Sequence, residues 1–536
     1  MGYRVVAQPG SKAVEKMLMD RAESFDAGGR AVAGAIASDV LRIDPRGAAV
    51  SVYSNPKNST SAVFNVADLA ETALAVRKSE VLAIDARRTG SPQLLGTIAD
   101  QIGRHDGAIE IILSTIALNN RAASYHSNLG TVFQAQGKLD EAEACYERAL
   151  ALKPGLAEAR SNLGNILQAQ GKLDEAVACY ERALALKPDC APAHYNLGYA
   201  LRALGNLDEA LVRYRRALAL QPDYAKARFA ESLAQLFKGD FAAGWHNYES
   251  RWQSKDHNTQ ARNYPQPLWT GEKLASGRLL IWGEQGVGDE IMFTGLIPDV
   301  IRTGNRCMLD CDARLKPLFA RSFPDIDVVS GHDPGHDPEL DIAAHLPSGS
   351  LPGLFRSTNA AFASTTSPYL IADSVQRERF RARYADGRRL VGLAWQTNNR
   401  KTGHSRSNDL SWFAPLFART DIRWISLQYG DYDVLEAQAA AASAPILIDR
   451  SVNQLSDIDT FAAQIAALDL VVTIDNSTAH LAGALGVPTW VLLPFAPDWR
   501  WLQIGEDSLW YPTMRLFRQL KLGDWQSVVQ RVHNVL

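Results

Sequence analysis

The sequence predicts an array of short α-helices followed by two α/β lobes. A 34-residue period runs through the first half of the chain, and helices with such a period stack into an extended array. A polar segment with two prolines then ends the helical pattern. Beyond it, apolar β-type runs alternate with helical stretches in two successive series, which is typical of parallel sheets covered by helices.

Each repeat carries small residues, one aromatic residue and a closing proline at fixed positions. The positions recur at Asn128, Asn162 and Asn196; Gly130, Gly164 and Gly198; Tyr146, Tyr180 and Tyr214; and Pro154, Pro188 and Pro222. This pattern resembles the tetratricopeptide repeat, and implies an α-superhelix. We place the array at residues 87–256, with three clear repeats at 123–224 and degenerate repeats on either side.

Residues 1–86 are predicted to be helical and to contain degenerate repeats. Two stretches, FDAGGRAVAGAIASDVLRIDP and ADLAETALAVRKSEVLAIDA, read as the second helices of weak repeats. The polar stretch VSVYSNPKNSTS at residues 50–61 interrupts the register between them.

An asparagine occupies the same place on the first helix of each clear repeat, and first helices line the concave face of such an array. A side-chain amide both donates and accepts hydrogen bonds, so it can bind the backbone of an extended peptide. Asn128, Asn162 and Asn196 resemble the asparagine ladder of O-GlcNAc transferases, which implies binding of an acceptor polypeptide. The alternative is that these side chains face solvent without a ligand.

Residues 257–277 are predicted to be a linker, followed by lobes at 278–385 and 386–536. In parallel sheets, ligands bind beyond the carboxyl ends of the strands. The cleft between the lobes is therefore the expected site.

The stretch LVVTIDNSTAHLAGALGVP at residues 470–488 reads as a strand, a polar turn and a helix. The free N–H groups of the first helical turn would face the carboxyl end of the strand, where they can bind an anion. Asp475, Asn476, Ser477 and His480 are the candidate binding residues. The alternative is an ordinary strand–helix corner that binds no ligand.

The stretch GEQGVGDE follows the first strand of the first lobe. It lacks the Lys-Ser/Thr of a P-loop, and Ile291 stands where a dinucleotide fingerprint needs its third glycine. Gly286 and Gly288 give a flexible turn, and Asp289 stands at the helix start. There its carboxylate either caps the helix or acts as a general base facing the cleft.

Together, GVGDEI and DNSTAHL resemble the bacterial heptosyltransferases and their relatives. The resemblance implies a GT-B fold, a pair of doubly wound Rossmann-like lobes that uses nucleotide-activated sugars. Asp289 matches the catalytic base, which takes the proton of the acceptor hydroxyl. Asp475, Asn476 and His480 match the donor-binding motif, although the family often has Thr where this chain has Asn476. The first lobe would face the acceptor and the second would hold the nucleotide-sugar.

Cations near the donor would neutralise the departing phosphate. Lys401 resembles the donor-phosphate lysine of the family, with Arg400 and Arg406 as alternatives in the same loop. A solvated basic loop without a ligand is the other interpretation. PFAPDWRWL at residues 494–502, with Trp510-Tyr511-Pro512, either shapes a sugar or base pocket or packs the end of the lobe. Arg500 lies between two tryptophans in this stretch, which favours a ligand contact and makes it a candidate donor-binding residue.

Two polar motifs are less convincing as sites. Asp310-Cys311-Asp312 spells the DxD that binds divalent metals in other glycosyltransferases, but it ends a strand of the first lobe. His332, His336 and His345 lie among Gly and Pro residues that prevent a helix from aligning them. We expect neither a metal nor a cofactor.

Composition excludes several classes of function. A net charge of −3 provides no basic surface for nucleic acid, and no apolar run is long enough to span a bilayer. The N-terminus lacks the pattern of a secretory signal, and five unpaired cysteines fit reduced thiols. We therefore expect a cytoplasmic location.

The motifs together predict a metal-independent, inverting glycosyltransferase that modifies a protein held by the repeats. The combination is similar to bacterial protein O-glycosyltransferases, including those that modify flagellin with nonulosonic acids, so flagellin is one candidate acceptor. With such a sugar the donor would be a CMP-sugar and the leaving group a monophosphate. The alternatives are a lipopolysaccharide or capsule glycosyltransferase, or a tetratricopeptide adaptor without catalytic activity.

Overall fold

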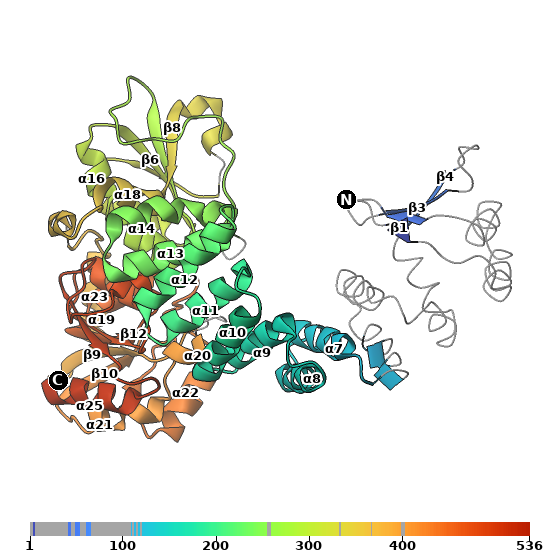
Figure 1. The fold of residues 1–536 in the computed structure, drawn as a ribbon. Coiled ribbons are helices and arrows are strands. Elements are labelled where there is room, and N and C mark those ends of the chain that lie inside the picture. The colour runs from blue at the N-terminus through green and yellow to red at the C-terminus, as the bar shows by residue number, and fades with distance from the viewer. Residues whose placement is uncertain are drawn as a thin grey trace, which may run out of the picture. The chain divides into compact units, whose positions relative to one another are not determined.

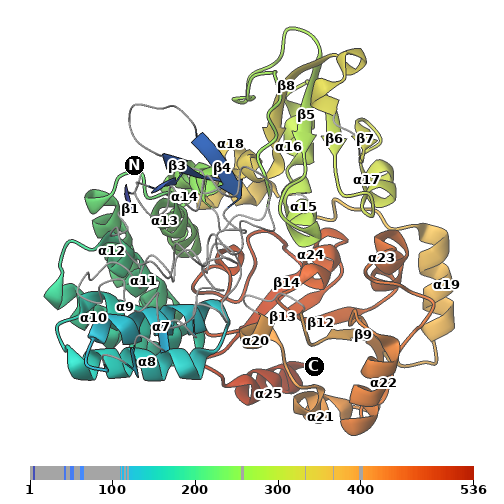
Figure 2. The same cartoon turned by 90° about the vertical axis from the view of Figure 1, so that its right-hand side faces the viewer.

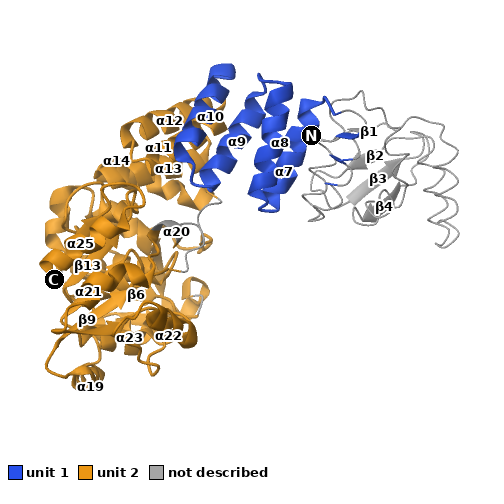
Figure 3. Ribbon diagram, turned by 90° about the horizontal axis from the view of Figure 1, so that it is seen from below, with its two compact units in different colours: residues 1–189 blue, residues 190–536 orange. Residues whose placement is uncertain are grey.

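The chain forms two compact units, residues 1–189 and 190–536, which Figure 3 shows in blue and orange. The computed structural model describes residues 120–536, apart from 255–258, 332–333, 366 and 398–402, together with short stretches before residue 120. The division falls between the second and third clear repeats. The second unit therefore contains the last helix pairs together with both large sheets.

Short strands, rather than the helices that we expected, are what the structure describes within residues 1–86. They pair antiparallel in the order β1-β2-β3-β4. Their bounds are β1 Arg4–Val5, β2 Leu41–Ile43, β3 Ala49–Tyr53 and β4 Ser61–Asn65. The sequences AVSVY and SAVFN carry β-branched and aromatic residues, which favour extended backbone over helix. The rest of the helical prediction lies outside the described residues.

The clear repeats are antiparallel helix pairs, as predicted. The first unit contains α7 Ala123–Ala135, α8 Leu139–Leu152, α9 Ala157–Ala169 and α10 Leu173–Leu186. The second contains α11 Ala191–Ala203, α12 Leu207–Leu220, α13 Ala225–Lys238 and α14 Phe241–Tyr248, followed by a 3-10 turn, η1, at Glu249–Gln253. Asp and Glu at the first turns of α8, α10 and α12 stabilise the positive ends of these helices.

The paired glycine and tyrosine of each repeat explain why the two helices approach so closely. A Cβ at Gly164 would lie 2.7 Å from the Tyr180 ring, and one at Gly130 would lie 2.9 Å from the Tyr146 ring. Both rings are completely buried. Each tyrosine therefore fills the space that the missing glycine side chain leaves open.

The first large sheet of the second unit is parallel, with strand order β7-β6-β5-β8 (Figure 2). Figure 1 labels two of its strands, β6 and β8. Its strands are β5 Arg278–Trp282, β6 Arg306–Asp310, β7 Asp327–Val329 and β8 Ile342–Pro347. The helices between and after them are α15 Val287–Thr294, α16 Ile297–Arg302, α17 Lys316–Ser322 and α18 Leu351–Phe355. Apolar runs such as LLIW are buried on both faces, as parallel strands require.

The second large sheet is also parallel, with strand order β11-β10-β9-β12-β13-β14. Its strands are β9 Arg389–Ala394, β10 Ile422–Ser426, β11 Ile446–Leu447, β12 Leu470–Ile474, β13 Thr489–Leu493 and β14 Met514–Arg518. Its helices are α20 Gly403–Arg406, α21 Ala414–Phe417, α22 Tyr432–Ala441, α23 Ile458–Ala466, α24 Ser477–Ala484 and α25 Trp525–Val535. The order reverses between β9 and β12, where such sheets have their binding crevice.

Helix α19 (Ser374–Tyr384) packs on α23 of the second lobe, although we had placed residues 374–384 in the first lobe. The Tyr384 hydroxyl donates to Asp449 over 2.7 Å, and Gln464 donates to Tyr384 over 2.9 Å. The helix precedes the second sheet in the sequence, which is why we assigned it to the first lobe. Its buried residues Phe380 and Tyr384 instead pack it on the second lobe.

The predicted linker is held along the first lobe. The described part of residues 257–277 contains no helix and no multi-residue strand, in line with its prolines. Yet Trp269 is almost fully buried, and its backbone N–H donates to His345 over 2.9 Å.

Replacing Gly164 by alanine should destabilise the first unit by about 1–3 kcal/mol, because the new Cβ would press into the buried Tyr180 ring. Chemical denaturation of the full chain measures this loss. Gly155→Ala is the matched control, since a Cβ there meets nothing within 4 Å. Equal stability of the two variants would contradict this account of the helix contact.

Candidate functional site

Asp289 lies in the first turn of α15, directly beyond the carboxyl end of β5. Its carboxylate accepts a hydrogen bond from the backbone N–H of Gly286 over 3.2 Å and forms an ion pair with Arg500. Burial raises the pKa of Asp289, while the Arg500 guanidinium opposes the rise. A carboxyl group with this environment is suited to general-base chemistry.

Arg500 comes from the other lobe, in the 3-10 turn η7 (Trp499–Trp501) that follows β13. Besides Asp289, it binds Asp498 over 2.5 Å, and its guanidinium lies 4.5 Å from the centre of the Trp499 ring. Its side chain is only 11% exposed. The nearby carboxylates raise its pKa despite the opposing effect of burial, so Arg500 stays charged.

A second buried ion pair lies at the switch point of the second sheet. Arg406, in the segment after β9, contacts Asp475, directly after β12, over 3.0 Å. Its other terminal nitrogen lies 3.9 Å from Asp498. Burial raises the pKa of Asp475, whereas Arg500 and Arg406 outweigh burial and lower the pKa of Asp498. Asp498 thus lies between two guanidinium groups.

The repeats add a third cation to this cluster. Arg202 is in the last turn of α11, and its guanidinium lies 5.1 Å from the centre of the Tyr199 ring. Burial alone would lower its pKa, but Tyr214, Tyr199 and Asp498 raise it. Arg202 is thus close enough to Asp498 for the two charges to interact. The guanidinium groups of Arg406 and Arg500 are the ones that pair with the carboxylates of Asp289, Asp475 and Asp498.

Helix α24 begins at this cluster with polar groups that are not fully used. The Asn476 side-chain oxygen caps the helix by accepting from the backbone N–H of Ala479 over 3.3 Å, and it also accepts from Thr473 over 3.1 Å. The Asn476 amide nitrogen and the Thr478 hydroxyl are buried and have no hydrogen-bond partner among the described residues. These two donors are therefore available to hydrogen-bond a ligand at the start of α24.

The first turns of α15 and α24 lie against each other (Figure 2). A Cβ at Gly288 would lie 3.2 Å from the His480 ring and 3.5 Å from the Cα of Ser477. Gly288 therefore permits the close approach of two helix N-termini, whose partial positive charges add at this point.

His480 is a neutral, fixed component of the site. Its Nδ1 lies 2.9 Å from the Tyr511 hydroxyl, and its ring stacks on Trp501 with 5.3 Å between the ring centres. Burial first, and then Arg500, lower its pKa to about 3. A neutral imidazole can exchange hydrogen bonds with a ligand without adding charge.

The structure thus brings together the predicted residues of both lobes. These are Gly286, Gly288, Asp289, Asp475, Asn476, Ser477, His480 and Arg500. Lys401 and Arg400 lie outside the described residues, while Arg406 is in the cluster. Tyr511 lies in the stretch Trp510-Tyr511-Pro512, which the sequence offered as a candidate pocket wall, whereas no individual role was predicted for Asp498 or Arg202. For Asp498, its position two residues before Arg500 was the available signal.

The predicted peptide-binding asparagines are half-buried on successive first helices. Asn128 and Asn162 lie on α7 and α9 in the first unit, and Asn196 lies on α11 in the second. Burial raises the pKa of Tyr146 in the preceding repeat, and a hydrogen bond from the Asn162 side chain partly opposes that rise. This asparagine therefore makes a contact between repeats as well as reaching the surface.

The residues of the DxD stretch are engaged in ion pairs. Asp310 pairs with Arg262, and Asp312 contacts Arg314 over 2.7 Å. The Trp282 indole N–H donates a hydrogen bond to Nδ1 of His345 over 3.2 Å. Within the described residues, no group of three His, Cys, Asp or Glu side chains is arranged to hold a metal ion.

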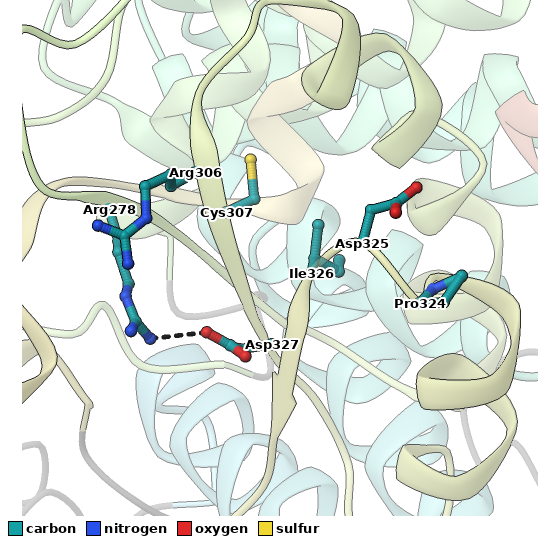
Figure 4. Close-up of a pocket in the computed structure, with 7 residues that line it drawn as sticks. All are labelled: Arg278, Arg306, Cys307, Pro324, Asp325, Ile326 and Asp327. Atoms are coloured by element: carbon teal, nitrogen blue, oxygen red, sulfur yellow. Dashed lines mark hydrogen bonds and ion pairs between the residues drawn. The ribbon is translucent and has the colours of Figure 1, made fainter.

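A separate small pocket of about 170 Å³ lies at the amino-terminal ends of the strands of the first sheet, away from Asp289 (Figure 4). Arg278, Arg306 and Asp327 line it, and each is the first residue of its strand. Arg278 binds Asp327 across it over 2.6 Å. Parallel sheets bind ligands at the carboxyl ends of their strands, so this amino-terminal pocket is a poor candidate for the site.

Comparisons with known proteins identify the repeats. Residues 120–189 and 155–223 match the tetratricopeptide repeat family, which confirms the predicted repeat type. Protein FlbA of Caulobacter vibrioides is 28% identical over 335 residues, covering 58% of this chain and 54% of FlbA. The chain thus spans about half the length of this curated relative.

Among solved structures, MamA is 23% identical with a TM-score of 0.27, over 29% of this chain and 91% of MamA. YrrB, described as a TPR protein with an unusual peptide-binding site, is 18% identical with a TM-score of 0.28, over 33% of this chain and 91% of YrrB. In the described part of this chain, no helix has the length and apolar character needed to cross a membrane.

The buried His480 should make stability fall as the pH is lowered. Its pKa is near 6.5 when unfolded and about 3 when folded, so between these values the unfolded chain binds the extra proton. His480→Gln should reduce the pH slope of the unfolding free energy by up to about 1.4 kcal/mol per pH unit below pH 6. Denaturation curves from about pH 4.5, which lies between the two pKa values, to about pH 7.5, which lies above both, measure the change in slope.

Thr489→Val is the control for this experiment. Thr489 is buried in the same lobe and binds no proton in this range, so its replacement should shift stability equally at every pH. An unchanged slope in His480→Gln would show that His480 is not held neutral.

Proposed function

We propose that the chain is a GT-B-type glycosyltransferase that transfers a sugar from a nucleotide-sugar to a hydroxyl group of a protein bound by the repeats. The observation that carries this proposal is the ion pair of Asp289 with Arg500 at the N-termini of α15 and α24, next to the ion pairs of Arg406. A candidate base thus lies beside two buried guanidinium groups, which can bind a phosphate by exchanging their carboxylate partners. The repeat family supports the protein acceptor, because such arrays present extended binding surfaces.

In this mechanism, Asp289 removes the proton of the acceptor hydroxyl as the hydroxyl oxygen attacks the anomeric carbon. The bond from that carbon to the phosphate oxygen breaks, and its electron pair stays on the phosphate. Attack on the face opposite the leaving group inverts the configuration. Arg406, Arg500 and the first turn of α24 stabilise the negative charge that develops on the leaving group.

The ion pair between Arg500 and Asp289 couples donor binding to activation of the base. Arg500 lowers the pKa of Asp289 against the effect of burial. Burial already outweighs Arg500, so a donor phosphate that takes over the Arg500 guanidinium would raise the pKa of Asp289 further and make the carboxylate more basic. The base is therefore strongest when the donor is in place.

Two alternatives keep part of this proposal. A lipopolysaccharide or capsule glycosyltransferase would use the same base and cations but a carbohydrate acceptor. A non-catalytic adaptor would use the repeats alone. Flagellin remains one candidate protein acceptor, on the sequence resemblance only. Intact masses of proteins that co-purify with the full chain distinguish these cases, since only a protein acceptor gains the mass of a sugar.

Asp289→Asn should abolish transfer, with a loss of about 10²-fold to 10⁴-fold, because an amide cannot accept the proton. The same variant should bind inorganic pyrophosphate more tightly than the wild type, because Arg500 no longer has Asp289 as a competing partner. Mass spectrometry of the acceptor and titration calorimetry measure the two effects.

Asp312→Asn is the matched control, because Asp312 pairs with Arg314 outside the cluster. It should leave both quantities unchanged. Full transfer by Asp289→Asn would exclude Asp289 as the base, and loss of pyrophosphate binding would contradict its competition for Arg500.

Replacing Asn128, Asn162 and Asn196 together by alanine should reduce acceptor capture about tenfold or more, because several backbone hydrogen bonds of about 1 kcal/mol each would be lost. Capture is measured as the amount of acceptor that co-purifies with the Asp289→Asn chain. The control variant replaces Glu147 and Glu181, which are exposed on second helices. Equal capture by the two variants would show that the asparagines do not bind the acceptor.

A further inference from the structure

The last helix pair of the array continues the repeat register but changes one of its positions. Tyr248 follows Tyr214 at the 34-residue spacing, as Tyr180 follows Tyr146. Arg251 stands where the clear repeats have a buried alanine at Ala149, Ala183 and Ala217. A buried alanine closes the contact between helices, whereas an arginine at this position must find a partner for its charge.

Arg251 finds that partner in the first lobe, directly after β5. It is fully buried and makes two hydrogen bonds of 2.9 Å to Glu284, which is also fully buried. The backbone N–H of Gly349 donates to the same Glu284 carboxylate over 2.7 Å, and Arg251 also donates to Ser350 over 2.8 Å. A buried pair with its hydrogen bonds satisfied in this way fixes the position of η1 relative to the turn between β5 and α15, residues 283–286, which contains Glu284.

Tyr248 contacts the next residue of the same turn. Its hydroxyl accepts a hydrogen bond of 2.6 Å from the Gln285 amide. Gln285 has a φ of 70°, a left-handed conformation that costs energy for a residue other than glycine. In the first two clear repeats the tyrosine hydroxyl bonds within its own repeat instead: Tyr146 to Gln134 over 3.2 Å, and Tyr180 to Asn165 over 2.8 Å.

The β5–α15 turn (residues 283–286) leads directly to the proposed base. Gly286, next to Gln285, donates the N–H that binds Asp289. A displacement of Gln285 would therefore move the hydrogen-bond donor that orients the Asp289 carboxylate. Tyr248 is also close enough to Arg500 and Asp289 for both charges to affect its pKa, after the larger effect of burial.

We infer that Tyr248 and Arg251 are positioning residues for Asp289, so that the last repeat is part of the catalytic lobe. The importance of this positioning for transfer rests on the proposed function, whereas the support of the turn does not. The catalytic part of the chain then begins at α13, before the linker at residues 257–277 rather than after it. Because Arg202 of α11 lies near Asp498, the helix pairs α7–α10 of the first unit are the part that can serve acceptor binding alone.

Hydrogen–deuterium exchange of the full chain tests the support of the turn. Tyr248→Phe removes only the hydroxyl, so amides in residues 283–290 should exchange about fivefold to tenfold faster, the effect expected for one lost hydrogen bond. Gln285→Ala should give a similar increase, and the double variant should exceed neither single variant by much, because both lose the same bond. Tyr180→Phe is the matched control and should leave these amides unchanged.

Unchanged exchange in Tyr248→Phe would overturn the inference. In the transfer assay, Tyr248→Phe should lower kcat by a similar factor and leave the KM for the nucleotide-sugar unchanged, because only the base is displaced. Faster exchange with an unchanged kcat would overturn the positioning of Asp289. Faster exchange in a chain whose wild type transfers no sugar would leave the turn's support standing and reject the proposed function.

Discussion

The site depends on the need to neutralise charges that are buried between two lobes. Asp289 and Asp498 both pair with the Arg500 guanidinium. Arg406 in turn pairs with Asp475 and lies near Asp498, so the two ion pairs form one network. A buried charge without a partner is costly, whereas a network with its hydrogen bonds satisfied is stable. Because these charges come from different lobes, their pairing also holds the lobes together at the carboxyl ends of the sheets. An anionic ligand would join the same network by exchange of partners.

The repeats belong to this site as well as to an acceptor surface. Trp245 of α14 packs edge-on against Trp499, with 5.3 Å between ring centres, and its indole N–H donates to the backbone of Arg356 over 3.0 Å. These contacts bury a large aromatic surface. The Arg251–Glu284 ion pair adds hydrogen bonds of defined geometry, which fix the orientation of the last helix pair on the lobe. A tetratricopeptide pair has thus replaced some of its internal contacts with contacts to the α/β lobe.

Much of the fold could be predicted because its signals are local. The repeat period, the glycine–tyrosine pairing and the apolar β runs each depend on residues close in sequence, and the structure has helix pairs and parallel strands at those places. Within residues 1–86, the helical prediction was wrong at β2, which lies inside the stretch FDAGGRAVAGAIASDVLRIDP, whereas β3 and β4 lie between the two predicted helical stretches. The sequence prediction also placed α19 in the wrong lobe, because chain order does not decide packing.

The sequence by itself determined that Asp289 starts one helix after a strand and that Asn476 starts another. It also determined the repeat register, in which Arg251 replaces an alanine. Only the tertiary structure decided that Arg500 pairs with Asp289, 211 residues away, and that Arg251 reaches Glu284. The physical reason is that local periodicity sets backbone structure, whereas the partner of a buried charge is chosen by whichever opposite charge the packed chain brings within a few ångströms.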